Sequence, residues 1–180
     1  KRSGNFVLVS EILPKIGKDV LRFFMLTRKN DAHLDFDLEK CLNETNENPS
    51  FYVQYAYARI SSLKKIAKQK KIKFDESHLP SIKNLVSNEE LSIIREISLW
   101  PKIIESSVAF KEPHRIVYYL IELSGKFHAY WSLGKSNSSF KILSEDNSEL
   151  TQARLLLLEM VQSVIRNGLE ILTVSVKEKM

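Results

Sequence analysis

The chain has 180 residues, of which 43% are hydrophobic, and a formal net charge of +5 with a pI near 9.2. This hydrophobic content is typical of a globular domain with its own core and excludes an intrinsically disordered chain. The moderate positive charge favours a polyanionic partner such as a nucleic acid without requiring one, since many soluble domains of this balance bind none.

The single cysteine, Cys41, excludes a disulfide framework and a thiolate metal site, and it favours a reducing compartment. No apolar run approaches the roughly 20 residues that a membrane-spanning helix needs. The basic start, Lys1–Asn5, is not followed by the apolar core of a signal peptide. Because the sequence does not begin with Met, we expect it to be a piece of a longer protein, located in the cytoplasm.

The first 45 or so residues predict short helices joined by polar turns. A loop and a short extended piece are expected over residues 1–9. Gly17 is a residue type that ends helices, and Asp19 and Arg28 lie where their charges complement a helix dipole. The expected helices run from Ser10 or Glu11 to Gly17, over Asp19–Arg28, and over Asp37–Asn43.

Asn48 and Pro49 begin the strongest helix signal of the chain. Asn accepts hydrogen bonds from the first free N–H groups of a helix, and Pro fits the first helical position because its missing N–H would be unpaired there. No Pro or Gly follows before Lys73, so we expect one helix to that residue. Spacings of three and four place one stripe on it, formed by Tyr52, Tyr55, Arg59, Leu63 and Ile66.

The second half predicts four more helical segments. Residues 74–86 form a connection that includes a short helix around Leu79–Leu85, and Ser87 with Glu90 forms a capping box for the next helix. Strand patterns are almost absent, so the sequence predicts an all-α helical bundle. The remaining expectations are a kink or a break at Pro101, a helix from Pro113 to Gly134, a polar loop over Lys135–Ser148, and a last helix from about Ser148, which Gly168 either ends or opens to a close neighbour.

Residue patterns for self-sufficient catalysis are absent from the sequence. Its five glycines are scattered, so no Gly-rich loop can cradle a phosphate, and its four histidines lack the spacing of metal ligands. Asp35 and Asp37 form a carboxylate pair, but a capping role fits them better than acid–base chemistry. We therefore expect no metal site and no cofactor in this chain itself.

Two features are suited to nucleic acid. The first is the lysine cluster between Lys64 and Lys73, which is either a solvated face or a phosphate-binding surface. The second is the aromatic group Phe127, Tyr130 and Trp131, flanked by cations. Such a stripe is usually core, but Tyr130 and Trp131 are adjacent and cannot face the same way, so one of them is expected at the surface. An exposed aromatic beside cations can stack an unpaired base.

Several motifs, in order along the whole chain, resemble arginyl-tRNA synthetases. Asn48-Pro49, followed by Tyr52–Ala56 and Ala58-Arg59, resembles the long helix that opens their C-terminal domain. Lys1–Asn5 resembles the end of the class I signature loop Lys-Met-Ser-Lys-Ser, and Asp19–Arg22 resembles the Asp-Ala-Leu-Arg signature of their anticodon-binding domain. Matches also occur at Leu34–Leu38, Glu112–Arg115, Phe127-His128 with Trp131, Asn167–Leu169 and Met180, whereas Thr173 replaces a common Gly, and Val176 and Lys177 stand where Pro is common.

The resemblance implies a division into residues 1–17, the tail of the signature loop and a connector, and residues 18–180, an α-helical anticodon-binding domain. It implies that the intact enzyme ligates arginine to tRNA(Arg) with ATP and magnesium, and that Lys1 belongs to its catalytic loop. The catalytic domain would lie elsewhere in the same chain, so this part alone would be inactive. We further expect a monomer with no membrane association.

By the same resemblance, anticodon-loop contacts fall on Trp131, Lys135 and Met180. Tyr52, Tyr55 and Arg59 are expected to support or touch the tRNA, and we assign Lys64 and Lys68 to phosphate contacts. Two other classes remain open: a stand-alone helical RNA-binding module, and a protein-interaction bundle without ligase activity. The latter would bind without the steep salt dependence that phosphate contacts impose.

Overall fold

The computed structural model describes residues 8–29, 31–144 and 146–180. Within these ranges every regular element is helical, which confirms the predicted all-α fold. Lys1 and the rest of the signature-loop resemblance lie outside the described residues. The elements are α1 (Val9–Met25), α2 (Leu38–Leu42), α3 (Pro49–Gln69), the 3₁₀ segment η1 (Glu76–Asn84), α4 (Asn88–Ser98), α5 (Trp100–Phe110), α6 (His114–Ser136), the 3₁₀ segment η2 (Ser138–Phe140) and α7 (Ser148–Ile171).

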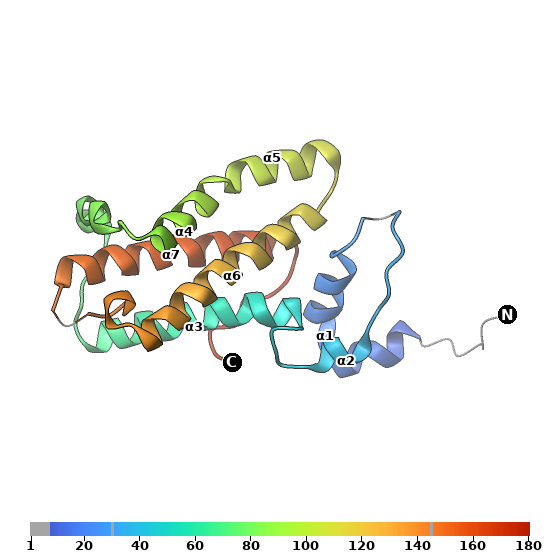
Figure 1. The fold of residues 1–180 in the computed structure, drawn as a ribbon. Coiled ribbons are helices and arrows are strands. Elements are labelled where there is room, and N and C mark those ends of the chain that lie inside the picture. Colours follow the sequence, from blue (N-terminus) through green and yellow to red (C-terminus); the bar gives the residue numbers. More distant parts are fainter. Residues whose placement is uncertain (1–7, 30, 145) are drawn as a thin grey trace.

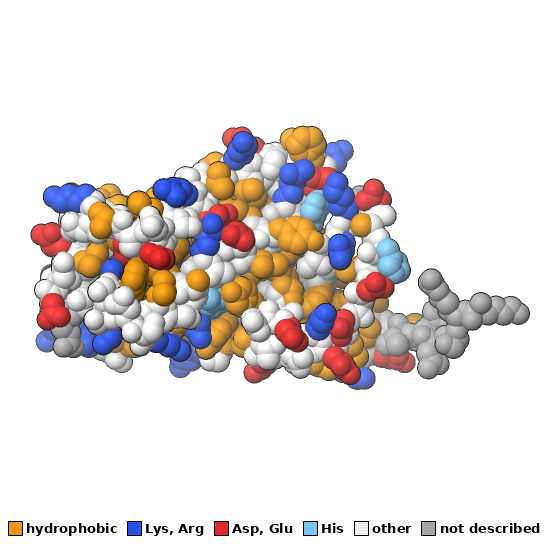
Figure 2. Space-filling view, viewed as in Figure 1, with side chains coloured by type: hydrophobic (Ala, Val, Ile, Leu, Met, Phe, Trp, Pro, Cys, Tyr) orange, Lys and Arg blue, Asp and Glu red, His pale blue; other side chains and the backbone are white. Residues whose placement is uncertain are grey.

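Three long helices, α3, α6 and α7, form the body of the molecule and pack against one another (Figure 1). Helices α4 and α5 cover α6 on one side, and α1 and α2 lie at one end, where α1 contacts α3. Segment η1 lies at the opposite end against α7. Figure 2 shows hydrophobic side chains exposed over the middle of one face, with basic and acidic side chains along its edges.

Helix α3 begins as the sequence predicts and ends earlier. Asn48 Oδ1 accepts a hydrogen bond from the Phe51 amide at 3.1 Å, and Pro49 follows at the first position. The prediction of a helix to Lys73 is wrong, since α3 ends at Gln69. Lys71 adopts a left-handed φ of 58°, and the Ile72 amide donates to the Ala67 carbonyl at 2.9 Å. This closing turn is usually marked by Gly, and here a lysine takes it.

The other boundaries follow the sequence with small shifts. Gly17 is non-helical, with a φ of 78° and a ψ of 160°, and separates two helical stretches of α1 at a kink, as the sequence predicts. The second stretch ends at Met25, three residues before the expected Arg28. The capping box of Ser87 and Glu90 is present, and Pro101 lies in the first turn of α5 after a break. The short helix expected near Leu79–Leu85 is a 3₁₀ segment that begins earlier.

Gly168 allows a close approach of α6 to α7. It lies inside α7 and is buried, and a Cβ atom built on it would lie 2.7 Å from Leu120 Cδ2 of α6. Contacts under about 3 Å are not tolerated between carbon atoms in a close-packed interior. Of the two roles that the sequence left open for this glycine, the structure therefore supports close helix packing.

A buried polar network connects α4, α6 and α7. The Glu90 carboxylate accepts hydrogen bonds from Arg154 Nε at 2.7 Å and from the Tyr130 hydroxyl at 2.8 Å. Arg154 also donates to the Lys141 carbonyl at 2.8 Å. Burial alone raises the pKa of Glu90, but the hydrogen bonds from Arg154, Tyr130 and Ser87 outweigh it and hold the pKa below its ordinary value. The network fixes Tyr130 inward, which answers the question that the sequence left open about Tyr130 and Trp131.

We predict that Glu90→Gln lowers the free energy of unfolding by about 3–5 kcal/mol, because it leaves the Arg154 charge buried without its partner. The carboxylate contributes stability above its unfolded pKa and loses it as pH falls through its lower folded pKa. Urea unfolding at pH 7 and pH 4 measures both effects. The exposed Glu105 of α5 provides the control Glu105→Gln. A Glu90→Gln variant as stable as this control would contradict the prediction.

Helix α7 ends in a turn that normally takes Gly. Thr173 has a left-handed φ of 54°, and the Val174 amide donates to the Leu169 carbonyl at 2.8 Å. A β-branched residue is strained in this region. The turn directs the C-terminal tail back onto α3, where Gln54 Nε2 donates to the Ser175 carbonyl at 2.8 Å.

We predict that Thr173→Gly raises the free energy of unfolding by roughly 0.5–1 kcal/mol, since relief of the left-handed strain exceeds the entropy that Gly adds to the unfolded chain. Thermal unfolding followed by circular dichroism measures the change. Thr173→Ala, which keeps Cβ without the branch, should fall between the two. A glycine variant that melts at or below the wild-type temperature would rule out the strain.

Candidate nucleic-acid interface

A cavity of about 290 Å³ lies among α3, α6 and the C-terminal tail. It brings together five of the eight residues assigned to tRNA contact within the described part of the chain. Helix α3 supplies Tyr55 and Arg59, α6 supplies Trp131 and Lys135, and the tail supplies Met180. Because each helix contributes a pair spaced by four residues, the two side chains of a pair lie on one face, one turn apart.

Arg59 is the cation at the centre of this cavity. Its Nη2 donates to the Tyr55 hydroxyl at 3.0 Å, and its guanidinium carbon lies 4.1 Å from the centre of the Tyr55 ring. The same carbon lies 5.5 Å from the Trp131 ring. Both distances are within the range of cation–π attraction. The aromatic rings thus hold the guanidinium in place without cancelling its charge.

His128 fixes Arg59 from the other side, and the sequence did not assign it this role. Its Nε2 donates to the Tyr52 carbonyl at 3.1 Å, so its Nδ1 accepts from Arg59 Nη1 at 3.0 Å. Burial lowers the pKa of His128, the hydrogen bond to Tyr52 raises it, and the Arg59 charge lowers it again, leaving it below the ordinary value of 6.5. A neutral imidazole is therefore present at pH 7, and it adds no charge to the cavity.

Tyr52 supports the cavity without lining it. Its ring lies 4.5 Å from the His128 ring, and burial raises the pKa of its hydroxyl. The signal for His128 in the sequence was its position three residues before Trp131, which places both on one face of α6. That spacing alone could not separate a packing histidine from one that holds an arginine.

Both cations of this cavity, Arg59 and Lys135, have no ion pair within the described residues. Lys135 is exposed at the edge of the cavity, and Trp131 is only partly buried. An unpaired base can stack on an accessible aromatic face, and a nearby phosphate can neutralise the cations. The arrangement is suited to holding a single-stranded nucleotide.

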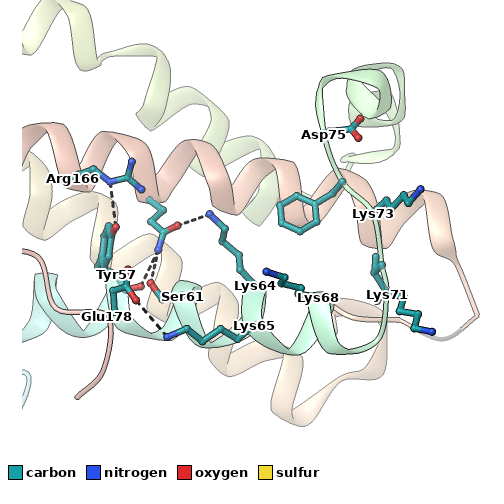
Figure 3. Close-up of a pocket in the computed structure, with 13 residues that line it drawn as sticks. Tyr57, Ser61, Lys64, Lys65, Lys68, Lys71, Lys73, Asp75, Arg166 and Glu178 are labelled. Atoms are coloured by element: carbon teal, nitrogen blue, oxygen red, sulfur yellow. Dashed lines mark hydrogen bonds and ion pairs between the residues drawn. The ribbon is translucent and has the colours of Figure 1, made fainter.

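Lys64 and Lys68 lie apart from this cavity. They line a larger groove on a neighbouring face of α3 (Figure 3). Lys64 forms an ion pair with Glu159 of α7 and donates to Gln162 Oε1 at 2.9 Å, whereas Lys68 lies farther along the groove. The structure therefore divides the predicted contact residues between two surfaces.

Neither a metal site nor a membrane-spanning helix is found among the described residues. They contain no group of three His, Cys, Asp or Glu side chains placed to hold a metal ion. Their helices are too short or too polar to cross a bilayer. Burial raises the pKa of the Cys41 thiol to about 11, so this cysteine is not a reactive thiolate at neutral pH.

The fold is an all-α bundle, and its cavity combines aromatic and cationic side chains. These features define a class of protein: a helical domain with a surface suited to single-stranded nucleic acid. Residues 53–180 match the family described as the DALR anticodon binding domain, and the chain belongs to this family. The match begins within α3, so Asp19–Arg22, which resembles the Asp-Ala-Leu-Arg signature, lies before it in α1.

The chain is also similar to arginine–tRNA ligases. It is 45% identical to the enzyme of Rickettsia peacockii (strain Rustic) over 183 residues, which covers 100% of this chain and 32% of that protein. The chain thus spans about a third of the length of this relative.

Solved structures share the fold. A putative arginyl-tRNA synthetase from Campylobacter jejuni superimposes with a TM-score of 0.76 and 24% identity, covering 100% of this chain and 37% of that one. The arginyl-tRNA synthetase of Plasmodium falciparum superimposes with a TM-score of 0.68 and 22% identity, and the match covers 90% of this chain and 26% of that one. At these identities, the likeness concerns the fold alone.

We predict that the pKa of His128 lies below 6.5 and that Arg59→Gln raises it, because this change removes a nearby positive charge. NMR titration of the imidazole resonances measures both values. Since the folded pKa is the lower one, neutral His128 stabilises the fold above its unfolded pKa and loses this contribution as pH falls through the folded value. Lys135→Gln is the control. A wild-type His128 that titrates above 6.5 would contradict the proposed arrangement.

Proposed function

We propose that this chain binds the anticodon side of tRNA(Arg) and forms the tRNA-binding part of an arginine–tRNA ligase. One observation carries the proposal. Trp131, Lys135 and Met180, which the family resemblance assigns to the anticodon loop, line one cavity. Tyr55 and Arg59 of α3, which are expected to support or touch the tRNA, line the same cavity. Membership of an anticodon-binding family and similarity to arginine–tRNA ligases support the same conclusion.

In the proposed complex, an unpaired anticodon base stacks on the accessible part of Trp131. Arg59 uses two of its five N–H donors on His128 and Tyr55, which leaves others for base edges or phosphate. Lys135 offsets phosphate charge at the edge of the cavity. Met180 contributes an adaptable apolar contact from the tail.

The wider proposal concerns the longer protein. A catalytic domain in the same chain would use ATP and magnesium, and Lys1 would belong to its signature loop. Residues 1–17 would then comprise the tail of that loop and the connector, and the kink at Gly17 coincides with that boundary. We further propose that the protein is a cytoplasmic monomer, and that residues 1–180 alone have no ligase activity.

We predict that Trp131→Ala weakens binding of tRNA(Arg) by about 5- to 150-fold, which corresponds to the roughly 1–3 kcal/mol of one stacked base. The measurement is a fluorescence titration against tRNA(Arg) and a non-cognate tRNA at two salt concentrations. Phe110→Ala, which removes an exposed aromatic of α5 outside the cavity, is the matched control.

The outcomes separate the candidate functions. Preference for tRNA(Arg) that is lost in Trp131→Ala supports anticodon recognition at this cavity. Equal, salt-sensitive binding of both tRNAs by the wild type would instead indicate a general RNA-binding module. Absence of RNA binding at low salt would favour a protein-interaction bundle and overturn the proposal.

A further inference from the structure

A second hollow of about 730 Å³ lies beside the C-terminal half of α3 (Figure 3). It shares no lining residue with the cavity of Tyr55, Arg59 and Trp131 described above, which we call the aromatic cavity. Helix α3, helix α7, the segment after α3 and the C-terminal tail all contribute to its lining. Six of the thirteen lining residues are basic, and two, Asp75 and Glu178, are acidic. We call this hollow the lysine groove; its basic residues are Lys64, Lys65, Lys68, Lys71, Lys73 and Arg166.

One end of the lysine groove is held rigidly by buried hydrogen bonds. Gln162 of α7 is buried, and its Nε2 donates to Ser61 Oγ of α3 at 2.7 Å. Arg166 Nε donates to the Tyr57 hydroxyl at 3.2 Å, and Lys64 Nζ donates to the side-chain oxygen Oε1 of Gln162 at 2.9 Å. These bonds tie α3 to α7, so this end of the lysine groove is formed before any ligand arrives.

The other end of the lysine groove is shaped by the turn at Lys71. The left-handed conformation of this residue reverses the chain after α3. Ile72 and Phe74 then pack against the core, while Lys71 and Lys73 line the same hollow as Lys68. In a continuous helix Lys71 would share a face with Lys68, but Lys73 would lie about 140° around the axis from Lys68. The early end of α3 brings all three cations onto one groove.

Only part of this charge is neutralised within the protein. Lys64 pairs with Glu159, and Lys65 Nζ lies 3.5 Å from the Glu178 carboxylate of the tail. Lys68, Lys71 and Lys73 have no ion pair within residues 8–29, 31–144 and 146–180. The Glu178 pair is exposed on both sides, so a competing anion can displace the tail carboxylate at little cost.

We propose that the lysine groove is a second RNA contact, which binds the phosphate backbone of the same tRNA, and that Glu178 occupies a phosphate position in the free protein. That the ligand is RNA rests on the proposed function. A polymer of phosphates fits better than one compact anion, because Lys64 and Lys68 are about 6 Å apart along α3 and Lys71 continues the row. A single small anion could not contact all of them.

The experiment compares the triple variant Lys68→Gln, Lys71→Gln and Lys73→Gln with a control that loses three exposed lysines elsewhere, Lys15, Lys18 and Lys102. Binding of tRNA(Arg) and a non-cognate tRNA is titrated over a range of salt concentrations. For three backbone contacts, the slope of log affinity against log salt should become shallower by about 2 in the groove variant. The control should retain the wild-type slope.

A second variant tests the role of the tail in the opposite direction. Glu178→Gln removes the competing carboxylate and should tighten binding of both tRNAs by roughly 1.5- to 5-fold, as expected for an exposed ion pair. Glu170→Gln, at an exposed position of α7, is the control. Weaker or unchanged binding in Glu178→Gln would overturn the assignment of Glu178.

The lysine groove and the aromatic cavity can fail separately. If the wild type prefers tRNA(Arg) but the groove variant keeps the control slope, the groove proposal is wrong and anticodon recognition stands. If the salt slope of the groove variant becomes shallower but the wild type binds both tRNAs equally, the groove is an RNA contact and the proposed anticodon function is wrong. A wild type that binds neither tRNA at low salt would contradict both.

Discussion

The periodicity of α3 is the constraint on which the rest of the structure depends. With 3.6 residues per turn, its side chains divide into separate faces. Val53, Ala56 and Ile60 are fully buried in the core shared with α6 and α7. A second face presents Tyr55 and Arg59 to the aromatic cavity, and a third carries the lysines of the groove. Because one rigid helix sets all three faces, any rotation of α3 that improved one would misplace the other two.

Much of the fold could be predicted from local sequence, because its determinants are local. The caps at Asn48 and Ser87 and the break at Pro101 depend on hydrogen bonds within a few residues, and all three were predicted correctly. The end of α3 was not, since Lys71 takes a left-handed turn that Gly normally marks. That turn brings Ile72, which is partly buried, against the core, and such packing is a property of the whole fold.

The candidate sites show the same limit. A resemblance placed Tyr55, Arg59, Trp131, Lys135 and Met180 in one function, and the structure places them in one cavity. The sequence could not show that Tyr130 turns inward, because its partner Glu90 is forty residues away. It also could not show that His128 holds Arg59, or that Lys64 is paired with Glu159. These contacts connect helices, so helical spacing on a single element carries no signal for them.

The two surfaces treat positive charge in different ways, and this difference bears on what each can recognise. In the aromatic cavity, Arg59 is held by neutral partners, so its charge and spare N–H donors remain available to a ligand. In the lysine groove, carboxylates already neutralise part of the charge, and in the proposed complex a phosphate replaces the carboxylate of Glu178. The first arrangement favours selection among bases and the second favours backbone contact that does not depend on sequence. The C-terminal tail contributes Met180 to one surface and Glu178 to the other, so displacement of Glu178 by RNA would act on the segment that completes the aromatic cavity.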